Sequence, residues 1–335
     1  MGCRQIDVTN AAEVRRFGEI FERSWHRALP RVPSFTTDEL VAMARRQDGA
    51  ERLSLWLLSE GSDALAVATA EINAVDHLSL GWIRLFVDPL SRRAGHGSTL
   101  LRHVEGWLAS QGRHEFVAFM SHEDPAEQMA GECFAARNGY RVALRDETRI
   151  HPVPLDTQVL DRLEAVTSAT DDYQLISWRG RCPEALLEGR ARLASVFWLE
   201  APTGELPVSE ERWDNDRIRR TEDLIAAMGR ELVATGVVHR PSGDLVGFTE
   251  ITVAKSAPQT GFQWDTIVDR RHRGASLGIR LKVANLGELA ASGLGVAEVL
   301  TYNAASNLPM IAVNERLGCE VVARGSQWLK ELQVC

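Results

Sequence analysis

The sequence VDPLSRRAGHGS, residues 87–98, lies at the centre of the stretch that decides the fold of this chain. An apolar run ends at Asp88-Pro89, which is a turn signal, and a helical pattern of apolar residues begins at Leu100. Glycines let a backbone approach an anion closely, and the first N–H groups of a helix have no partner inside it. Arg92 and Arg93 add two positive charges. The stretch therefore predicts a strand, a loop suited to a pyrophosphate and a helix; the alternative is a tight turn whose glycines serve geometry alone.

This stretch occurs twice. An offset of 181 positions aligns residues 87–112 with residues 268–293 without a gap and gives ten identities in 26 positions. Ordinary residue usage would give about two. The identical pairs include Arg92 with Arg273 and Gly97 with Gly278. We therefore expect two copies of one domain, joined head to tail.

Composition limits the classes of function. The chain has 335 residues, which suits two domains of about 150 residues each. Its net charge of −8 argues against a nucleic-acid or anionic-membrane surface. The five cysteines include no C-x-x-C pair, and no run of about 18 apolar residues is present. We expect a soluble, cytoplasmic protein without a nucleic-acid or membrane partner, and the sequence indicates no particular oligomeric state.

Both halves show the same order of elements. In each, early helices precede three apolar or alternating runs that predict an antiparallel meander, and the loop and its helix follow. A strand, a helix and short final strands end each half. We expect an α/β (α+β) protein with two tandem domains, each a mixed, mostly antiparallel twisted sheet flanked by helices. The expected division is residues 1–152, a linker at 153–172, and residues 173–335.

The meander, the R-x-x-G-x-G loop with its helix, and the later strand, helix and Gly-aromatic turn together resemble the GNAT acyltransferase superfamily. The first copy matches the loop pattern with Arg92, Gly95 and Gly97, whereas Ser276 replaces a glycine in the second copy. The second half looks like two-domain GNAT proteins of the actinobacterial type, a group that includes mycothiol synthase. The resemblance covers nearly the whole chain, and the linker and the region from 209 to 229 remain unmatched.

This resemblance implies acetyl-CoA, or another acyl-CoA, as co-substrate, and no metal. The loop would cradle the pyrophosphate, and the strand before it would pair with pantetheine like an added β-strand. The coenzyme-binding residues that it implies are Phe86, Val87, Arg92, Arg93, Gly95, His96, Gly97 and Ser98 in the first copy, and Ile267, Val268, Arg273, Gly274, Ala275, Ser276, Leu277, Gly278, Asn303 and Asn307 in the second.

Carboxylates on the strands are the candidates for the general base that deprotonates an amine. We expect Glu250 and Asp265 in the second copy to take the catalytic role, and Glu71 is the counterpart of Glu250 in the first. For each of them, a solvated strand residue is the alternative. Many family members carry a tyrosine that protonates the departing thiolate, and Ala135 and Asn314 occupy that position here.

These observations together predict an N-acetyltransferase that transfers an acetyl or other acyl group from acyl-CoA to an amine of a small molecule. One copy would catalyse, with the second favoured, and the other would be structural or bind coenzyme. Two alternatives stay open. The first is a related acyl-CoA or acyl-carrier reaction, namely hydrolysis, decarboxylation or carrier-dependent transfer. The second is a non-catalytic acyl-CoA-binding module.

Overall fold

The computed structural model describes residues 1–46, 50–164 and 172–332. Two compact units make up the chain. Unit 1 consists of Met1–Asp146, Thr203–Ser209 and Ala323–Cys335, and unit 2 consists of Glu147–Pro202 and Glu210–Val322. The units therefore do not follow the order of the sequence strictly.

Unit 1 contains the first copy of the repeat and one strand from the end of the chain. Its elements are β1 (Gly2–Gln5), α1 (Ala11–Ala28), α2 (Thr37–Arg45), β2 (Glu51–Glu60), β3 (Asp63–Asn73), β4 (Leu80–Val87), the 3-10 helix η1 (Pro89–Ser91), α3 (His96–Ser110), β5 (Glu115–His122), α4 (Pro125–Arg137), the start of β6 (Arg141–Pro152) and most of β12 (Glu320–Glu331).

Unit 2 contains the second copy. Its elements are the end of β6, α5 (Thr157–Glu164), β7 (Tyr173–Arg179), α6 (Glu184–Ser195), α7 (Phe197–Glu200), α8 (Asn215–Ala227), β8 (Arg230–His239), β9 (Asp244–Ala254), β10 (Thr260–Val268), the 3-10 helix η2 (Arg270–His272), α9 (Leu277–Ala291), β11 (Glu298–Ala304), α10 (Leu308–Arg316) and the first residues of β12. The expected linker at 153–172 contains α5, and its residues 165–171 lie outside the described residues.

The strands of the two units have the same pairing pattern. Unit 1 contains the order β1-β2-β3-β4-β5-β12, and among these pairs only β4 and β5 run parallel. Unit 2 contains the order β11-β10-β9-β8-β7, and among these pairs only β10 and β11 run parallel. The prediction of mixed, mostly antiparallel strand pairing in each unit is confirmed.

The last strand of unit 1 comes from the second half of the sequence. Residues 324–331 of β12 pair antiparallel with β5 over its whole length, from His122 to Glu115. Trp328 packs into the core beneath α3, and Leu329 packs on Leu80 and Val117. The compact units thus divide within β12, whereas the division drawn along the sequence keeps residues 173–335 together.

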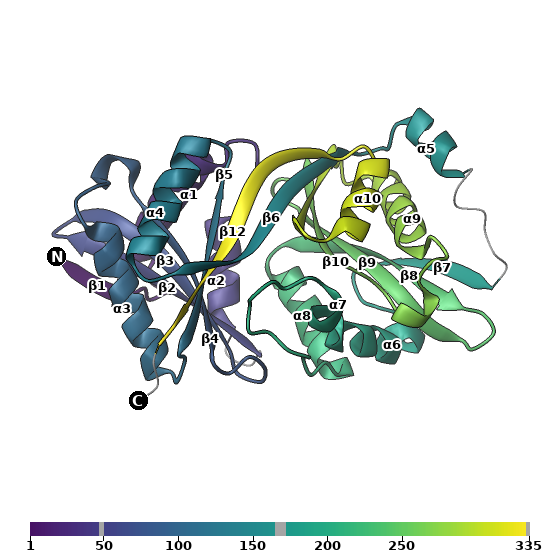
Figure 1. The fold of residues 1–335 in the computed structure, drawn as a ribbon, viewed down its shortest axis with the longest axis horizontal. Helices are drawn as coiled ribbons and strands as arrows, with labels where there is room; N and C mark the ends of the chain where they lie inside the picture. Colours follow the sequence, from purple (N-terminus) through teal and green to yellow (C-terminus); the bar gives the residue numbers. More distant parts are fainter. Residues whose placement is uncertain (47–49, 165–171, 333–335) are drawn as a thin grey trace. The chain divides into compact units, whose positions relative to one another are not determined.

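Helices cover both faces of each sheet. In unit 1, α1 and α2 bury Phe17, Phe21 and Leu40 on one face, and α3 buries Leu100 and Val104 on the other. In unit 2, α6, α7 and α8 lie on one side of β7–β10, and α9 and α10 lie on the opposite side (Figure 1). The start of each loop helix therefore lies on the face opposite the early helices.

Two helix starts follow from local sequence. The Asn10 side chain accepts hydrogen bonds from the Ala12 and Glu13 amides at the start of α1. Thr36 and Glu39 form a reciprocal capping box at the start of α2. Both helix starts are therefore determined by residues adjacent to them in the sequence.

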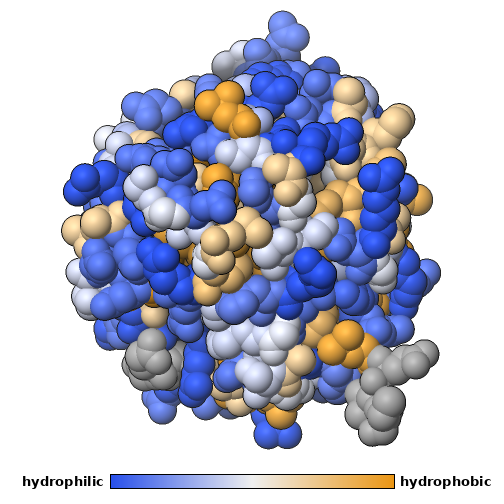
Figure 2. Space-filling view, turned by 90° about the vertical axis from the view of Figure 1, so that its left-hand side faces the viewer, coloured by the Kyte–Doolittle hydropathy of each residue, from blue (hydrophilic) through white to orange (hydrophobic). Residues whose placement is uncertain are grey.

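The surface drawn in Figure 2 is mainly hydrophilic, and its apolar residues form small separate spots. Within residues 1–46, 50–164 and 172–332, none of the helices combines the length and hydropathy needed to cross a bilayer.

Candidate active site

The predicted loop of unit 1 joins the end of β4 to the start of α3. The Asp88 carboxylate accepts a hydrogen bond from the Leu90 amide and one from Arg23 at 2.6 Å. Arg93 and Gly95 have φ of 67° and 84°, which turns the chain into the helix. Among the described residues no side chain caps α3, so its first N–H groups lack the partners that a cap would provide. The loop residues predicted from the sequence form this one segment: Arg92, Arg93, Gly95, His96, Gly97 and Ser98.

The two loop glycines of unit 1 have different functions. Gly95 has open space around it, and its left-handed backbone is what favours glycine there. A Cβ on Gly97 would lie 3.2 Å from atoms of Phe134 and Val87. Packing against α4 and β4 therefore explains Gly97, while backbone shape explains Gly95.

Arg92 is held in place by a carboxylate of α4. Its Nη1 lies 2.7 Å from Glu127 Oε2, and Arg27 reaches the other oxygen of Glu127 at 2.9 Å. Burial raises the pKa of Glu127, but hydrogen bonds and charge from Arg27 and Arg92 outweigh it and lower the pKa overall. Glu127 is thus ionised at neutral pH, and the loop arginine is oriented before any ligand binds.

Unit 2 repeats this loop with other partners. Arg273 Nη2 lies 2.6 Å from Glu200 Oε2, and Arg270 reaches the second oxygen of Glu200 at 3.2 Å. Asp269 pairs with Arg192 of α6, as Asp88 pairs with Arg23 of α1. In both units a carboxylate therefore holds the loop arginine, and this carboxylate belongs to α4 in unit 1 and to α7 in unit 2.

In the part of the chain that the structure describes, no side chain caps the start of α9 either. Gly274 and Ser276 supply the positive φ values, 87° and 53°. A positive φ costs a non-glycine residue roughly 1 kcal/mol of conformational free energy, so the backbone at Ser276 is more strained than at Gly95. The other predicted loop residues of unit 2 lie in this segment or in the first turn of α9: Arg273, Ala275, Leu277 and Gly278. Ala275 and Leu277 pack into a core cluster.

The parallel strands separate in front of each loop. Pairing of β4 with β5 extends to Ile83 and Ala118, and β4 continues to Val87. Pairing of β10 with β11 extends to Phe262, and β10 continues to Val268. A segment that has lost its neighbour on one side can accept an added extended chain.

The side chains of two predicted pantetheine residues point into the core. The Phe86 ring lies edge-on to Phe21, with ring centroids 5.1 Å apart. Ile267 is buried with the cluster beneath α6 and α8. Any contact of these residues with pantetheine would therefore use their backbone groups, not their side chains.

A β-bulge distinguishes the two central strands. Between Gln263 and Thr266 the register of β10 against β9 shifts, so Trp264 and Asp265 are the residues in the bulge. The Gln263 amide donates to the Glu250 carbonyl at 2.6 Å and supports this bend. In unit 1 the register of β3 with β4 runs without a shift. Asp265 is half-buried, and its position in a bulge follows from the local backbone.

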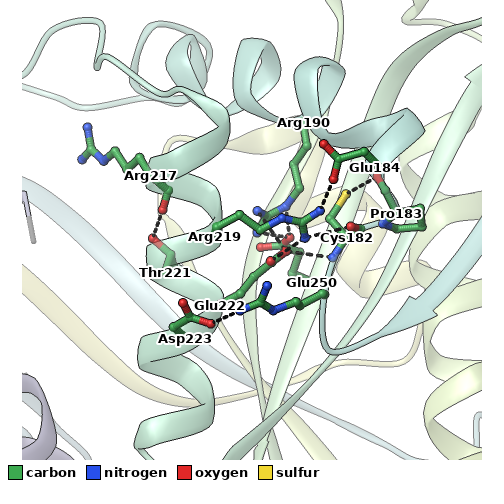
Figure 3. Close-up of polar contacts among 11 residues, drawn as sticks. Cys182, Pro183, Glu184, Arg190, Arg217, Arg219, Thr221, Glu222, Asp223 and Glu250 are labelled. Atoms are coloured by element: carbon green, nitrogen blue, oxygen red, sulfur yellow. Dashed lines mark hydrogen bonds and ion pairs between the residues drawn. The ribbon is translucent and has the colours of Figure 1, made fainter.

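Glu250 lies inside a buried ionic network in unit 2 (Figure 3). Its Oε1 lies 2.5 Å from Nη2 and 2.6 Å from Nε of Arg190, and both residues are 3% exposed. Burial raises the pKa of Glu250, Arg190 lowers it, and the net shift is upward. Glu222 joins the network through Arg219 at 2.9 Å and the Cys182 amide at 2.8 Å.

Glu71 has different surroundings in unit 1. It is half-buried, and Ile72 beside it packs beneath α3, so Glu71 faces the side of α1 and α2. Burial and then repulsion from Glu51 raise the pKa of Glu71, Arg84 opposes them, and the resulting pKa is about 7. Arg84 itself lies over the Phe119 ring, 4.5 Å from its centroid.

The two predicted asparagines have separate tasks. Asn307 caps α10 by accepting from the Met310 amide at 3.3 Å. Asn303 accepts from Asn314, which in turn accepts from Lys282. Asn314 therefore connects α10 to β11 and α9.

Sequence reasoning missed Arg190 and Lys282, although a signal was present. Arg190 follows Leu186 and precedes Ala194 at helical spacing on the buried face of α6. Lys282 lies between Ile279 and Leu286 in the same way on α9. A charged residue within an apolar helical stripe indicates a buried partner.

Comparisons with known proteins agree with this architecture. Residues 15–136 match the model of the acetyltransferase (GNAT) family. A tandem GNAT protein from the clavulanic acid biosynthesis pathway, solved without AcCoA, has a TM-score of 0.81 and 23% identity, covering 100% of this chain and 99% of that one. A GCN5-related N-acetyltransferase from Sphaerobacter thermophilus has a TM-score of 0.66 and 17% identity, covering 98% and 95%.

A third structure is the GCN5-related glucosamine N-acetyltransferase region of a fungal multi-domain GH3 β-N-acetylglucosaminidase. Its TM-score is 0.69 at 11% identity, and the match covers 98% of this chain and 38% of that one. No curated protein matches the sequence significantly. The chain therefore has the tandem GNAT fold over its whole length, and residues 15–136 of its first half match the GNAT acetyltransferase family.

Proposed function

We propose that this chain is an acyltransferase that moves an acyl group, acetyl from acetyl-CoA, to an amine of a small molecule. The observation that carries the proposal is present in both units: a helix start without a side-chain cap lies beside a basic loop and a strand segment that continues past the last pair with its parallel neighbour. Arg92 and the first N–H groups of α3 would hold the pyrophosphate in unit 1, and Arg273 and α9 would do so in unit 2. The coenzyme would supply the activated thioester carbonyl.

We further propose that unit 1 catalyses. A general base must reach its substrate and change protonation near the working pH. Glu71 fits both conditions, because it keeps part of its surface exposed and its pKa is raised to about 7. It would take the proton that the amine loses as its nitrogen attacks the thioester carbonyl. This ranking differs from the expectation drawn from the sequence, which favoured Glu250 and Asp265.

For unit 2 the buried pair of Glu250 with Arg190 favours a copy that binds coenzyme or supports the fold without turnover. A carboxylate that is 3% exposed and bound by a guanidinium is not placed to accept a proton from an amine. Asp265 in the bulge of β10 remains the second catalytic candidate in this unit. A non-catalytic second copy is consistent with the serine that replaces a loop glycine there.

The test is acetyl-CoA-dependent thiol release by the full chain with a panel of small amines, together with calorimetric titration of acetyl-CoA. We expect Arg92→Ala to remove thiol release and one binding site, and Arg273→Ala to weaken binding without removing turnover. Arg141→Ala is the control, because Arg141 pairs with Glu205 and Glu331 on an exposed strand end. Folded protein that neither binds acyl-CoA nor releases thiol would refute the proposal.

A further inference from the structure

A chain of hydrogen bonds runs through the interior of unit 2 from α9 to β11. Lys282 Nζ donates to Asn314 Oδ1 at 2.9 Å, and Asn314 Nδ2 donates to Asn303 Oδ1 at 2.5 Å. Lys282 is 1% exposed and Asn314 is 0% exposed, whereas Asn303 is half-buried. The chain thus ends at a partly open residue of β11, beyond the last pair that β11 makes with β10 at Leu300.

Packing alone does not explain Lys282. It lies in the apolar stripe of α9, and within the part of the chain that the structure describes it forms no ion pair with a carboxylate. A buried charge without a counter-ion lowers the free energy of unfolding by roughly several kcal/mol, even when it is hydrogen-bonded. Unit 1 has Leu101 and Ala135 at the corresponding positions, and both are part of its core. The fold therefore forms without these polar groups, and the chain of hydrogen bonds is a property of unit 2.

The two titratable side chains that interact with Lys282, His151 and Cys319, are both uncharged. Burial lowers the pKa of Lys282 to about 8, so the ammonium persists at pH 7. His151 of β6 is neutral, because burial and then the charge of Lys282 lower its pKa to about 3. Cys319, after α10, keeps its proton because burial raises its pKa to about 11.

Because Lys282 carries an ammonium, it determines the donor-to-acceptor direction of every hydrogen bond from Lys282 to Asn303. An ammonium can only donate, so Asn314 must turn its oxygen toward Lys282 and its NH2 toward Asn303. The oxygen of Asn303 then accepts from Asn314, and within the described residues its NH2 has no hydrogen-bond acceptor, so this NH2 is available to a ligand. Without Lys282, both amides could turn over and Asn303 could present its oxygen instead.

We propose that Lys282 is a positioning residue that acts through Asn314 and makes Asn303 present N–H donors to an acceptor oxygen of a ligand held along the segment of β10 that continues past its last pair with β11. The inference rests on the proposed function, in which that ligand is a coenzyme A thioester, whose extended arm carries amide carbonyl oxygens. Asn303 thus donates to an acceptor atom of the ligand, and Lys282, a buried cation on α9, determines that Asn303 presents donors and not its oxygen.

The first experiment needs no ligand. In protein labelled with 15N-asparagine, we expect the Asn314 side-chain NH2 to exchange slowly with solvent, because it is buried and hydrogen-bonded. Lys282→Met should raise that exchange rate about tenfold, the equivalent of one hydrogen bond, and Lys255→Met on an exposed turn should not. An unchanged rate in Lys282→Met would refute the positioning role.

The second experiment titrates acetyl-CoA into the full chain and follows the site that Arg273→Ala weakens. Asn303→Ala should bind about tenfold more weakly, and Asn303→Asp more weakly still, because a carboxylate offers no donor to a carbonyl oxygen. Lys282→Met should also weaken this site, and it should add little to Asn303→Ala in the double variant, because the two act through one contact.

Asn303→Asp that binds as well as the parent would refute the donor assignment, and additive losses in the double variant would refute action through Asn303. If Arg273→Ala weakens no site, the proposed coenzyme site of unit 2 fails instead. The exchange rate of the Asn314 side-chain NH2 in Lys282→Met then decides by itself whether the lysine orients the side chains of Asn314 and Asn303.

Discussion

Glu71 of β3 and Glu250 of β9 hold equivalent places in the two units, but their surroundings differ. Each precedes an isoleucine that packs under the loop helix, Ile72 under α3 and Ile251 under α9, so both carboxylates face the early helices. Glu250 meets Arg190 there and is buried with it, whereas Glu71 stays half-buried with a pKa raised to about 7. One duplicated position has thus become part of the core in one unit and a titratable group in the other.

The largest effect should follow from neutralising these carboxylates in turn. Glu71→Gln should lower the acyl-transfer rate by about 100- to 10,000-fold, because general-base assistance is lost. Glu250→Gln should leave the rate per folded molecule unchanged, although it removes the counter-ion of Arg190. Steady-state thiol release with a responsive amine measures both. The reverse ranking would make unit 2 the catalytic copy.

A large loss of stability should follow when the partner of Glu250 is removed. Arg190→Ala leaves Glu250 buried without its cation, and breaking such a pair costs about 3–5 kcal/mol. Arg181→Ala is the matched control, because Arg181 and Asp223 form an exposed pair worth about 0–1 kcal/mol. Urea denaturation of each variant measures the free energy of unfolding. A loss below about 1 kcal/mol in Arg190→Ala would contradict a tightly coupled buried network.

The raised pKa of Glu71 makes both activity and stability depend on pH. The base must be ionised to act, so kcat/KM should rise with pH through about 7 and then level off. Because the pKa of Glu71 in the folded chain lies above 4.5, the ordinary value for a glutamate, the folded chain keeps a proton that the unfolded chain releases between pH 4.5 and about 7. The stability that Glu71 contributes is therefore complete below pH 4.5 and is lost as pH rises through about 7.

Glu71→Gln should remove this decline in stability and flatten the same part of the pH profile of the residual activity. Thermal melts between pH 4 and pH 8 on the parent and the variant provide the comparison. A decline that persists unchanged in Glu71→Gln would assign it to another group.

The sequence predicted the repeat, the loops and both mixed sheets, because glycines, prolines and strand alternation are local signals. It did not predict that β12 completes unit 1, because strands of similar pattern do not specify a distant partner. Arg190 was missed for a related reason. Its place in an apolar stripe indicates burial, but its partner Glu250 lies 60 positions away, and only the packed fold brings the two together.

The loop residues lie together as the sequence indicated, and their binding role remains a prediction. The interpretation of Phe86 and Ile267 needed the structure, because the face toward which a strand residue points depends on which helices cover the sheet. For Asn303 the family resemblance implied an amide that contacts the coenzyme, which stays a prediction. Only the contacts through Asn314 to Lys282 define which end of that amide is available.

The smallest expected effect is a difference in stability between alanine variants at the second residue of the two loop helices, Gly97 in α3 and Gly278 in α9. Gly278 has open space where a Cβ would lie, so Gly278→Ala should stabilise the fold by about 0.4–1 kcal/mol through lower entropy of the unfolded chain. Gly97→Ala has the same entropic gain, but its Cβ would press on Phe134 and Val87 at 3.2 Å and should cancel or reverse it, since overpacking costs about 1–3 kcal/mol. Denaturation of the two alanine variants side by side measures the difference. Equal stabilisation by both would mean that α4 yields freely to the added methyl, and that packing does not hold Gly97 in the first loop.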